Sequence, residues 1–192
     1  MTRTAPEPAP LPAEAGALLT ELAAPPRLVA HLRLVHDVAL RLVDALGAEL
    51  GADRHGVLYG AATHDVGKVL HPEELSEPGS LHEEAGRALL LLARGVHPDR
   101  ARYAGTHASW TLPGISTEEL LVSLADKIWK GRRQADLEDL VAGRLAGARR
   151  QPLWEAFLAL DDVLGPLAEE AGPRLAYQAS FPVLPPRSPT SG

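Results

Sequence analysis

Cysteine is absent from this 192-residue chain. Its absence excludes disulfides, zinc–thiolate sites, iron–sulfur clusters and thiol nucleophiles. The chain also lacks a basic excess, because 19 lysines and arginines stand against 25 aspartates and glutamates, for a net charge of −6. Proteins that bind nucleic acid generally need a basic face, so we expect no nucleic-acid partner, although a local basic pocket is compatible with this charge. Any metal site must use histidine, carboxylate and water as ligands.

Long apolar runs are missing as well. The longest run, residues 88–93, is far too short to cross a bilayer. The first 16 residues contain no apolar segment of the kind found in signal peptides. We therefore expect no membrane partner and a cytoplasmic protein.

The residues that are present predict a single all-α domain. Apolar residues recur at spacings of three and four through most of the chain, and no stretch alternates with the period of a strand. The predicted helices cover residues 14–23, 28–50, 54–66, 81–94, 98–107, 118–129, 137–148 and 153–170. Asp53, Ser80 and Thr117 are the expected N-caps, and Glu83 would complete a capping box with Ser80.

Proline is concentrated at the two ends of the chain, where the sequence is otherwise polar. Such segments need not fold, so we predict flexible tails over residues 1–12 and 179–192. The helical domain then covers residues 13–178, with no linker long enough to divide it.

Eight histidines in a cysteine-free acidic chain require an explanation. His64 and Asp65 are adjacent at the end of a largely apolar helix, where burying either group without a partner is costly. A divalent cation that binds both would remove this cost. We expect Gly67 to let the helix stop and Lys68 to place a positive charge where it could meet a phosphate oxygen.

An adjacent His-Asp pair is weak evidence of a metal site by itself, because His36-Asp37 forms a second such pair. Two further ionisable groups, however, lie on apolar helix faces. His31 lies on the buried stripe of the 28–50 helix. Asp126 ends the apolar run 120–126, where a carboxylate needs a partner. One shared metal would satisfy all of these groups together.

Taken in chain order, these residues and the segments around them resemble the motifs of the HD-domain superfamily of metal-dependent phosphohydrolases. The matching segments are residues 31–35, 63–68, 71–75, 81–86, 103–107 and 123–127, within a motif region over residues 28–133. The resemblance implies an HD-type helical bundle in which one metal is bound by His31, His64, Asp65 and Asp126. His82 and His107 match additional histidines of members that hold two metals, with Asp65 bridging them. Gly86, one turn after His82, is expected to leave space beside that histidine.

Within the superfamily, the layout is similar to small bacterial enzymes that split diadenosine polyphosphates symmetrically. Residues 109–114, residues 125–127 and Arg132 carry this closer likeness. The chain departs from the family pattern at Thr63, where an apolar residue is usual, and it has no second histidine beside His107. The implied activity is hydrolysis of a phosphoanhydride or phosphoester of a nucleotide by metal-activated hydroxide, with Asp65 and Lys68 as catalytic residues.

Other polar residues are assigned by position. A basic cluster follows Asp126 and could neutralise a polyphosphate or could be a solvated surface: Lys127, Lys130, Arg132 and Arg133. His71 could bind substrate or be solvated. Glu83 is interpreted as a helix cap, His36 as a less suitable alternative to His31, and His55 and His97 as inert surface residues.

The expected cofactor is a divalent metal, as two ions of iron or manganese, although magnesium, cobalt, nickel and zinc suit the same ligands. The expected partner is a small phosphorylated molecule, a nucleotide. The oligomeric state is open, and the helices after residue 137 could form a homodimer surface. Two alternative functions use the same residues: a di-iron HD-type oxygenase, and a non-catalytic module that senses nucleotides.

Overall fold

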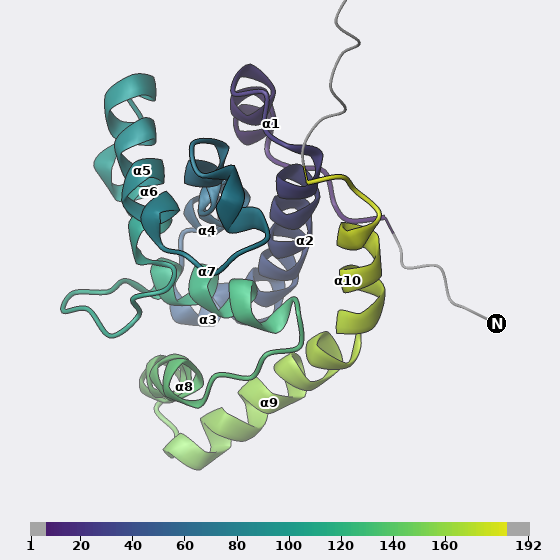
Figure 1. The fold of residues 1–192 in the computed structure, drawn as a ribbon. Coiled ribbons are helices and arrows are strands. Elements are labelled where there is room, and N and C mark those ends of the chain that lie inside the picture. The colour runs from purple at the N-terminus through teal and green to yellow at the C-terminus, as the bar shows by residue number, and fades with distance from the viewer. Residues whose placement is uncertain (1–6, 184–192) are drawn as a thin grey trace, which may run out of the picture.

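The computed structural model describes residues 7–183, and every regular element in that range is a helix (Figure 1). This confirms the predicted all-α class. The α-helices are α1 (Ala13–Glu21), α2 (Pro26–Leu42), α3 (Ala48–Leu50), α4 (Arg54–Thr63), α5 (Leu81–Ala88), α6 (Pro98–Thr106), α7 (Thr117–Ile128), α8 (Ala135–Arg149), α9 (Leu153–Glu169) and α10 (Ala171–Ala179). Shorter 3₁₀ turns, η2 (Val66–Val69) and η3 (Pro72–Leu75), follow α4, and π-helical turns extend α2 (Val43–Gly47) and α5 (Leu89–Ala93).

The centre of the molecule is formed by α2, α4 and α7, which all contact one another. Apolar side chains on these helices are completely buried, among them Leu42, Leu121 and Ile128. Removing such a side chain from water stabilises the fold by roughly 1.5–3 kcal/mol. Helices α8 and α9 cover one end of this centre, and α5 and α6 lie together at another side of it (Figure 1).

Helix α4 ends three residues earlier than predicted. It stops at Thr63, and Asp65 already has the non-helical angles φ −101° and ψ 13°. His64 still has helical angles, φ −55° and ψ −35°, and its backbone N–H bonds to the Gly60 oxygen, so the backbone leaves the helical conformation at Asp65. The helix ends at the His-Asp pair itself and not at Gly67.

Two predicted N-caps are wrong. The Ser80 side chain makes no cap hydrogen bond; instead the carboxylate of Glu74 accepts hydrogen bonds from the backbone N–H groups of Leu81 (3.0 Å) and His82 (3.1 Å). At α7 the cap is Ser116, which forms a capping box with Glu119, and not Thr117. Asp53 caps α4 as predicted.

The described parts of the two predicted tails contact the body of the molecule. The backbone N–H of Ala9 donates to Asp37 on α2 at 3.0 Å. Near the other end, Arg27 donates to the backbone oxygen of Phe181 at 2.9 Å. These contacts join residues 9 and 181, which lie in the predicted tails, to α2. The rest of the predicted tails, residues 1–6 and 184–192, lies outside the described residues.

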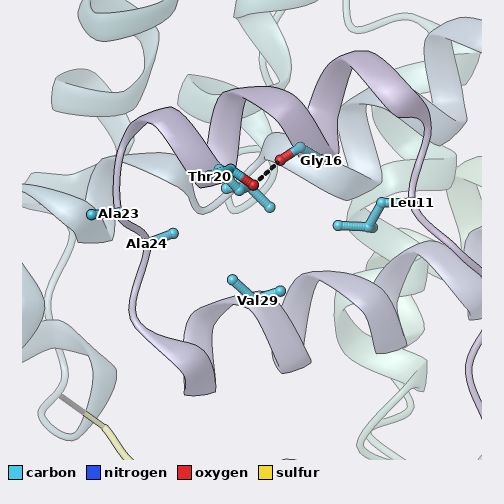
Figure 2. A pocket seen from close by; sticks show the side chains of 7 residues that line it. Leu11, Gly16, Thr20, Ala23, Ala24 and Val29 are labelled. Atoms are coloured by element: carbon cyan, nitrogen blue, oxygen red, sulfur yellow. Dashed lines mark hydrogen bonds between the residues drawn. The ribbon is translucent and has the colours of Figure 1, made fainter. Parts of the chain in front are cut away.

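A hollow of about 200 Å³ lies between α1 and α2 (Figure 2). Leu11, Leu19 and Val29 contribute to its apolar lining, and the hydroxyl of Thr20 donates to the Gly16 oxygen at 2.9 Å. Because Val29 precedes His31 by two residues, the two side chains leave α2 in nearly opposite directions. The hollow is therefore separate from the histidine-rich region described below.

Among residues 7–183, the structure contains no helix with the length and apolar character needed to span a membrane.

Candidate metal centre

Six ionisable side chains from five helices meet in the interior. They are His31 on α2, His64 and Asp65 at the end of α4, His82 on α5, His107 at the end of α6, and Asp126 on α7. None of the six is more than 6% exposed. The structure thus brings together all the residues that the sequence analysis placed around a metal.

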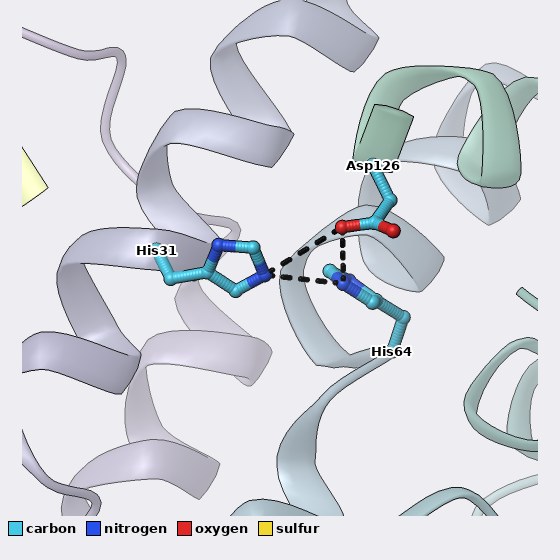
Figure 3. A group of neighbouring side chains, drawn as sticks. All are labelled: His31, His64 and Asp126. Atoms are coloured by element: carbon cyan, nitrogen blue, oxygen red, sulfur yellow. Dashed lines mark hydrogen bonds and ion pairs between the residues drawn. The ribbon is translucent and has the colours of Figure 1, made fainter. Parts of the chain in front are cut away.

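His31, His64 and Asp126 form what we call the core half of this cluster (Figure 3). The Nε2 atoms of the two histidines are 3.4 Å apart. They lie 3.8 and 3.6 Å, respectively, from Oδ1 of Asp126. The three donor atoms lie within 4.8 Å of one another, which is compatible with one shared ion.

His82 and His107 form the outer half of the cluster. Their Nε2 atoms lie 3.0 and 3.3 Å from Oδ1 of Asp65. The other oxygen of Asp65, Oδ2, lies 3.1 Å from Nε2 of His31. Asp65 therefore stands between the two halves, with one carboxylate oxygen facing each.

The histidine orientations match those of metal ligands. The Nδ1 atom of His64 lies 3.0 Å from the carbonyl oxygen of Ala61, and that of His107 lies 3.2 Å from the carbonyl oxygen of Ala104. A carbonyl only accepts, so Nδ1 carries the proton, and in the neutral ring the lone pair of Nε2 then faces the cluster. Ligating histidines are commonly oriented in this way.

The carboxylate of Glu74 orients His82, as the backbone carbonyl oxygens orient His64 and His107. Its Oε2 lies 2.5 Å from Nδ1 of His82, and the glutamate is itself buried. Nε2 of His82 has no hydrogen-bond partner among the described residues, although Asp65 lies 3.0 Å away. A buried lone pair beside a carboxylate is an expensive arrangement that a cation would relieve. The donor set thus fits a divalent metal.

Both carboxylates of the cluster are held in the ionised form. Burial raises the pKa of Asp65, but its electrostatic interactions with the surrounding histidines, His64 foremost, outweigh burial, so the pKa lies well below its usual range. Burial likewise raises the pKa of Asp126, and His64 together with Lys127 and Lys130 brings the net pKa well below normal. Ionised carboxylates are the form that binds metal.

Three lysines border the cluster. Nζ of Lys68 lies 2.6 Å from Oδ2 of Asp65, and Nζ of Lys127 lies 2.7 Å from Oδ2 of Asp126. Lys130 is farther away, at 4.0 Å from Asp126, and burial lowers its pKa. Lys127 also lies 5.5 Å from the centre of the Trp110 ring. The structure therefore places three of the predicted substrate-binding residues at the cluster.

The other predicted substrate-binding residues lie elsewhere. Arg133 forms ion pairs with Glu138 (2.7 Å) and Asp161 (2.8 Å), so its guanidinium ties the start of α8 to α9. Arg132 is exposed, near enough to Lys130 for its charge to lower the pKa of that lysine. His71 is partly exposed, and its Nδ1 lies 3.3 Å from a Glu73 oxygen.

The three remaining histidines have other surroundings. His36 is buried outside the cluster, where burial lowers its pKa and Nδ1 has no hydrogen-bond partner among the described residues. His55 and His97 are exposed, as predicted.

Two glycines hold the outer half against the His-Asp turn. A Cβ atom on Gly67 would lie 1.9 Å from the His82 carbonyl oxygen and 2.6 Å from the Gly86 nitrogen. The absent side chain of Gly86 leaves space beside His82, and the backbone of Gly67 fills that space: a Cβ atom on Gly86 would lie 3.0 Å from the Gly67 nitrogen. The missing side chains allow two backbones to touch, and this contact positions His82.

Sequence reasoning assigned no role to Glu74. The residue lies eight positions before His82, in a loop segment whose polarity is ordinary for an exposed turn. No local spacing links a 3₁₀ turn to the first turn of a later helix, so only the folded structure reveals the contact.

The comparisons with known proteins bear on the same region. A family model described as HD domain matches residues 28–129, which is 102 of the 192 residues. This range contains every residue of the cluster and its bordering lysines up to Lys127. Comparisons with curated proteins and with solved structures found no significant match.

Proposed function

The chain belongs to the HD-domain family, and we propose that it is a metal-dependent hydrolase that cleaves a phosphoanhydride or phosphoester bond of a nucleotide. One observation carries the proposal: buried histidines and carboxylates suited to a divalent metal are bordered by the ammonium groups of Lys68, Lys127 and Lys130. A metal-binding interior beside concentrated positive charge suits a reaction at phosphorus.

His31, His64 and Asp126 would hold one ion, His82 and His107 would hold a second, and Asp65 would contact both. Manganese or iron suits these ligands best in our proposal, since imidazole favours transition metals and carboxylate also accepts manganese. When bound, such ions supply a Lewis acid for the phosphoryl oxygens and an activated water nucleophile.

The lysines would bind and orient the phosphate chain. In the structure, Lys68 and Lys127 each lie against a carboxylate of the cluster. Once that carboxylate is neutralised by a cation, the ammonium groups are available to phosphoryl oxygens. Donors that are already in place at a buried site stabilise developing charge without reorganisation. Lys68 is the residue we assign to the reacting phosphoryl group.

Dinucleoside polyphosphates are the substrates we would test first. Their long anionic chain can contact several ammonium groups at once, and Lys130 and Arg132 extend the positive charge beyond Lys127. Mononucleotides and phosphodiesters complete the panel, because they carry fewer phosphates with the same chemistry.

The proposal is tested with the Mn²⁺-reconstituted protein by measuring phosphate-bond cleavage over this panel and bound ions per chain. We expect Asp65→Ala to lose bound metal and to lower kcat/KM at least about 1,000-fold, or about 4 kcal/mol. Asp37→Ala, in the other His-Asp pair, is the matched control and should retain both properties.

Three results would contradict the proposal. The first is near-normal turnover and metal content in Asp65→Ala. The second is oxygen-dependent turnover of the iron form without phosphate-bond cleavage, which would indicate a di-iron oxygenase. The third is nucleotide binding without turnover of any substrate in the panel, which would indicate a sensing module.

A further inference from the structure

Glu83 stands beside the outer half of the cluster without an evident structural role. Donor atoms of Glu83, His82 and His107 lie within 4.8 Å of one another. The sequence predicted that Glu83 would complete a capping box with Ser80, but the Ser80 side chain makes no cap hydrogen bond. The carboxylate of Glu74 accepts hydrogen bonds from the first N–H groups of α5 instead. Within residues 7–183, the Glu83 carboxylate has no hydrogen bond or ion pair. It is only partly exposed.

We propose that Glu83 is a metal ligand and completes the outer position together with His82, His107 and Oδ1 of Asp65. This inference rests on the proposed function, because it concerns the ions that the hydrolase would use. It adds a residue that the ordered histidine and aspartate series does not contain.

The donor balance between the two halves supports this assignment. The core half has its own carboxylate, Asp126, in addition to a shared oxygen of Asp65. Without Glu83 the outer half has two imidazoles, which are neutral when they bind metal, and only the other oxygen of Asp65. With Glu83, each position has two histidines, one carboxylate of its own and one shared carboxylate.

The charge balance leads to the same conclusion. Two divalent ions carry four positive charges, whereas Asp65 and Asp126 supply two negative charges. The nearby ammonium groups of Lys68 and Lys127 add further positive charge. A third carboxylate at the outer position reduces the repulsion between the ions, which is strong where water is excluded.

The next residue, Glu84, provides a matched control. It lies on the same turn of α5, but its carboxylate pairs with Arg87 through contacts of 3.0 and 2.9 Å and is exposed. Glu83→Gln and Glu84→Gln therefore remove the same charge from adjacent positions, and only the first lies at the cluster.

The experiment measures Mn²⁺ binding to the full chain by equilibrium dialysis with elemental analysis, and records the electron paramagnetic resonance spectrum of the bound ions. We expect two ions per wild-type chain with the signature of a coupled pair. Glu83→Gln should weaken the second binding step at least about tenfold, since even outer-shell partners of metals contribute roughly 10–100-fold. Its coupled signal should give way to that of isolated Mn²⁺, while Glu84→Gln behaves as wild type.

Superimposable isotherms for Glu83→Gln and the wild type would overturn this inference, and so would binding of a single ion by the wild type. Circular dichroism of the metal-free variants checks the fold, and Glu83→Asp should regain part of the second step if a carboxylate is the group required. The readout needs no turnover. A wild type that binds two ions in the expected manner but cleaves no phosphate bond would therefore refute the proposed function and leave the role of Glu83 intact.

Discussion

The two halves of the metal centre are built on different kinds of scaffold. His31, His64 and Asp126 of the core half come from α2, α4 and α7, which contact one another around fully buried apolar side chains. His82 and His107 of the outer half come from α5 and α6, a pair at the side of the molecule where Leu81 and Leu92 are exposed.

The comparison shows that the side chains of one cluster can be held in position in two different ways. The core half is positioned by the burial of many apolar groups, so no single contact decides it. The outer half depends on a few specific contacts: the Gly67–Gly86 backbone approach and the hydrogen bonds of Glu74. We expect the outer metal position to be the weaker one and the more sensitive to single substitutions.

The largest effect is expected for Gly67→Ala. A Cβ there would lie 1.9 Å from the backbone oxygen of His82, and backbone atoms cannot move aside as a flexible side chain can. We expect the free energy of unfolding to fall by about 3 kcal/mol or more, at the upper end for overpacking. Urea denaturation measures this loss. Gly143→Ala on α8, where a Cβ meets nothing within 4 Å, is the control and should be neutral or stabilising. Equal stability of the two variants would show that the Gly67–Gly86 contact does not support the outer half.

Metal binding should stabilise the outer half more than the core half. Free Mn²⁺ at 100 times its Kd stabilises the folded state that binds it by about 2.7 kcal/mol. Amide hydrogens that exchange only when this state opens should then exchange about 100-fold more slowly. Hydrogen exchange with and without Mn²⁺ measures this change for each helix. We expect the largest slowing in α5 and α6 and little in α2 and α7, whose packing is already extensive. Uniform slowing along the chain would contradict the proposed difference.

Glu74→Gln tests the polar support of the outer half alone. The amide can replace one oxygen but leaves at least one of the bonds to Leu81, His82 and the His82 ring unmade. We expect a loss of about 1–3 kcal/mol in unfolding free energy and roughly 10–100-fold weaker Mn²⁺ binding at the outer position. Glu73→Gln, at an exposed neighbour in the same turn, should change stability by less than about 0.5 kcal/mol. Unchanged Mn²⁺ affinity in Glu74→Gln would show that His82 needs no such support.

The smallest effect is expected outside both halves, at the ion pair of Arg133 with Glu138. The hydrogen bond from Arg133 holds the pKa of Glu138 below its ordinary value of 4.5, against the opposing effect of burial. Because the unfolded chain binds the proton more readily, this pair stabilises the fold above that pH, and its contribution disappears as the pH falls through the lower folded-state value. Urea denaturation should show Glu138→Gln to be less stable than the wild type by about 1 kcal/mol at pH 7, with the gap closing in acid. A gap that widens in acid would reverse the assigned direction of the shift, and Mn²⁺ binding should not change.

Sequence reasoning went furthest where a residue's type and its helical phase carry the information. The apolar stripe that contains His31 and the apolar run that ends in Asp126 both predicted inward-facing groups, and the structure brings them together. Sequence reasoning failed where a contact joins two segments that do not belong to the same helical repeat. Ser80 has the right type and spacing for a cap, but the carboxylate of Glu74 reaches the same N–H groups from a preceding turn. Arg133 follows the same pattern, since its charge suggested phosphate binding and two carboxylates of α8 and α9 engage it.

The sequence by itself determined the chemistry that is possible here. Without cysteine, a metal centre must use histidine and carboxylate, and helical periodicity turned those groups inward. Only the tertiary structure decided how they divide: which oxygen of Asp65 faces each half, that Glu74 orients His82, and that Glu83 stands beside the outer pair. The physical reason is that side-chain type and helical phase are local properties, whereas the distances within the cluster depend on how close packing places five helices against one another.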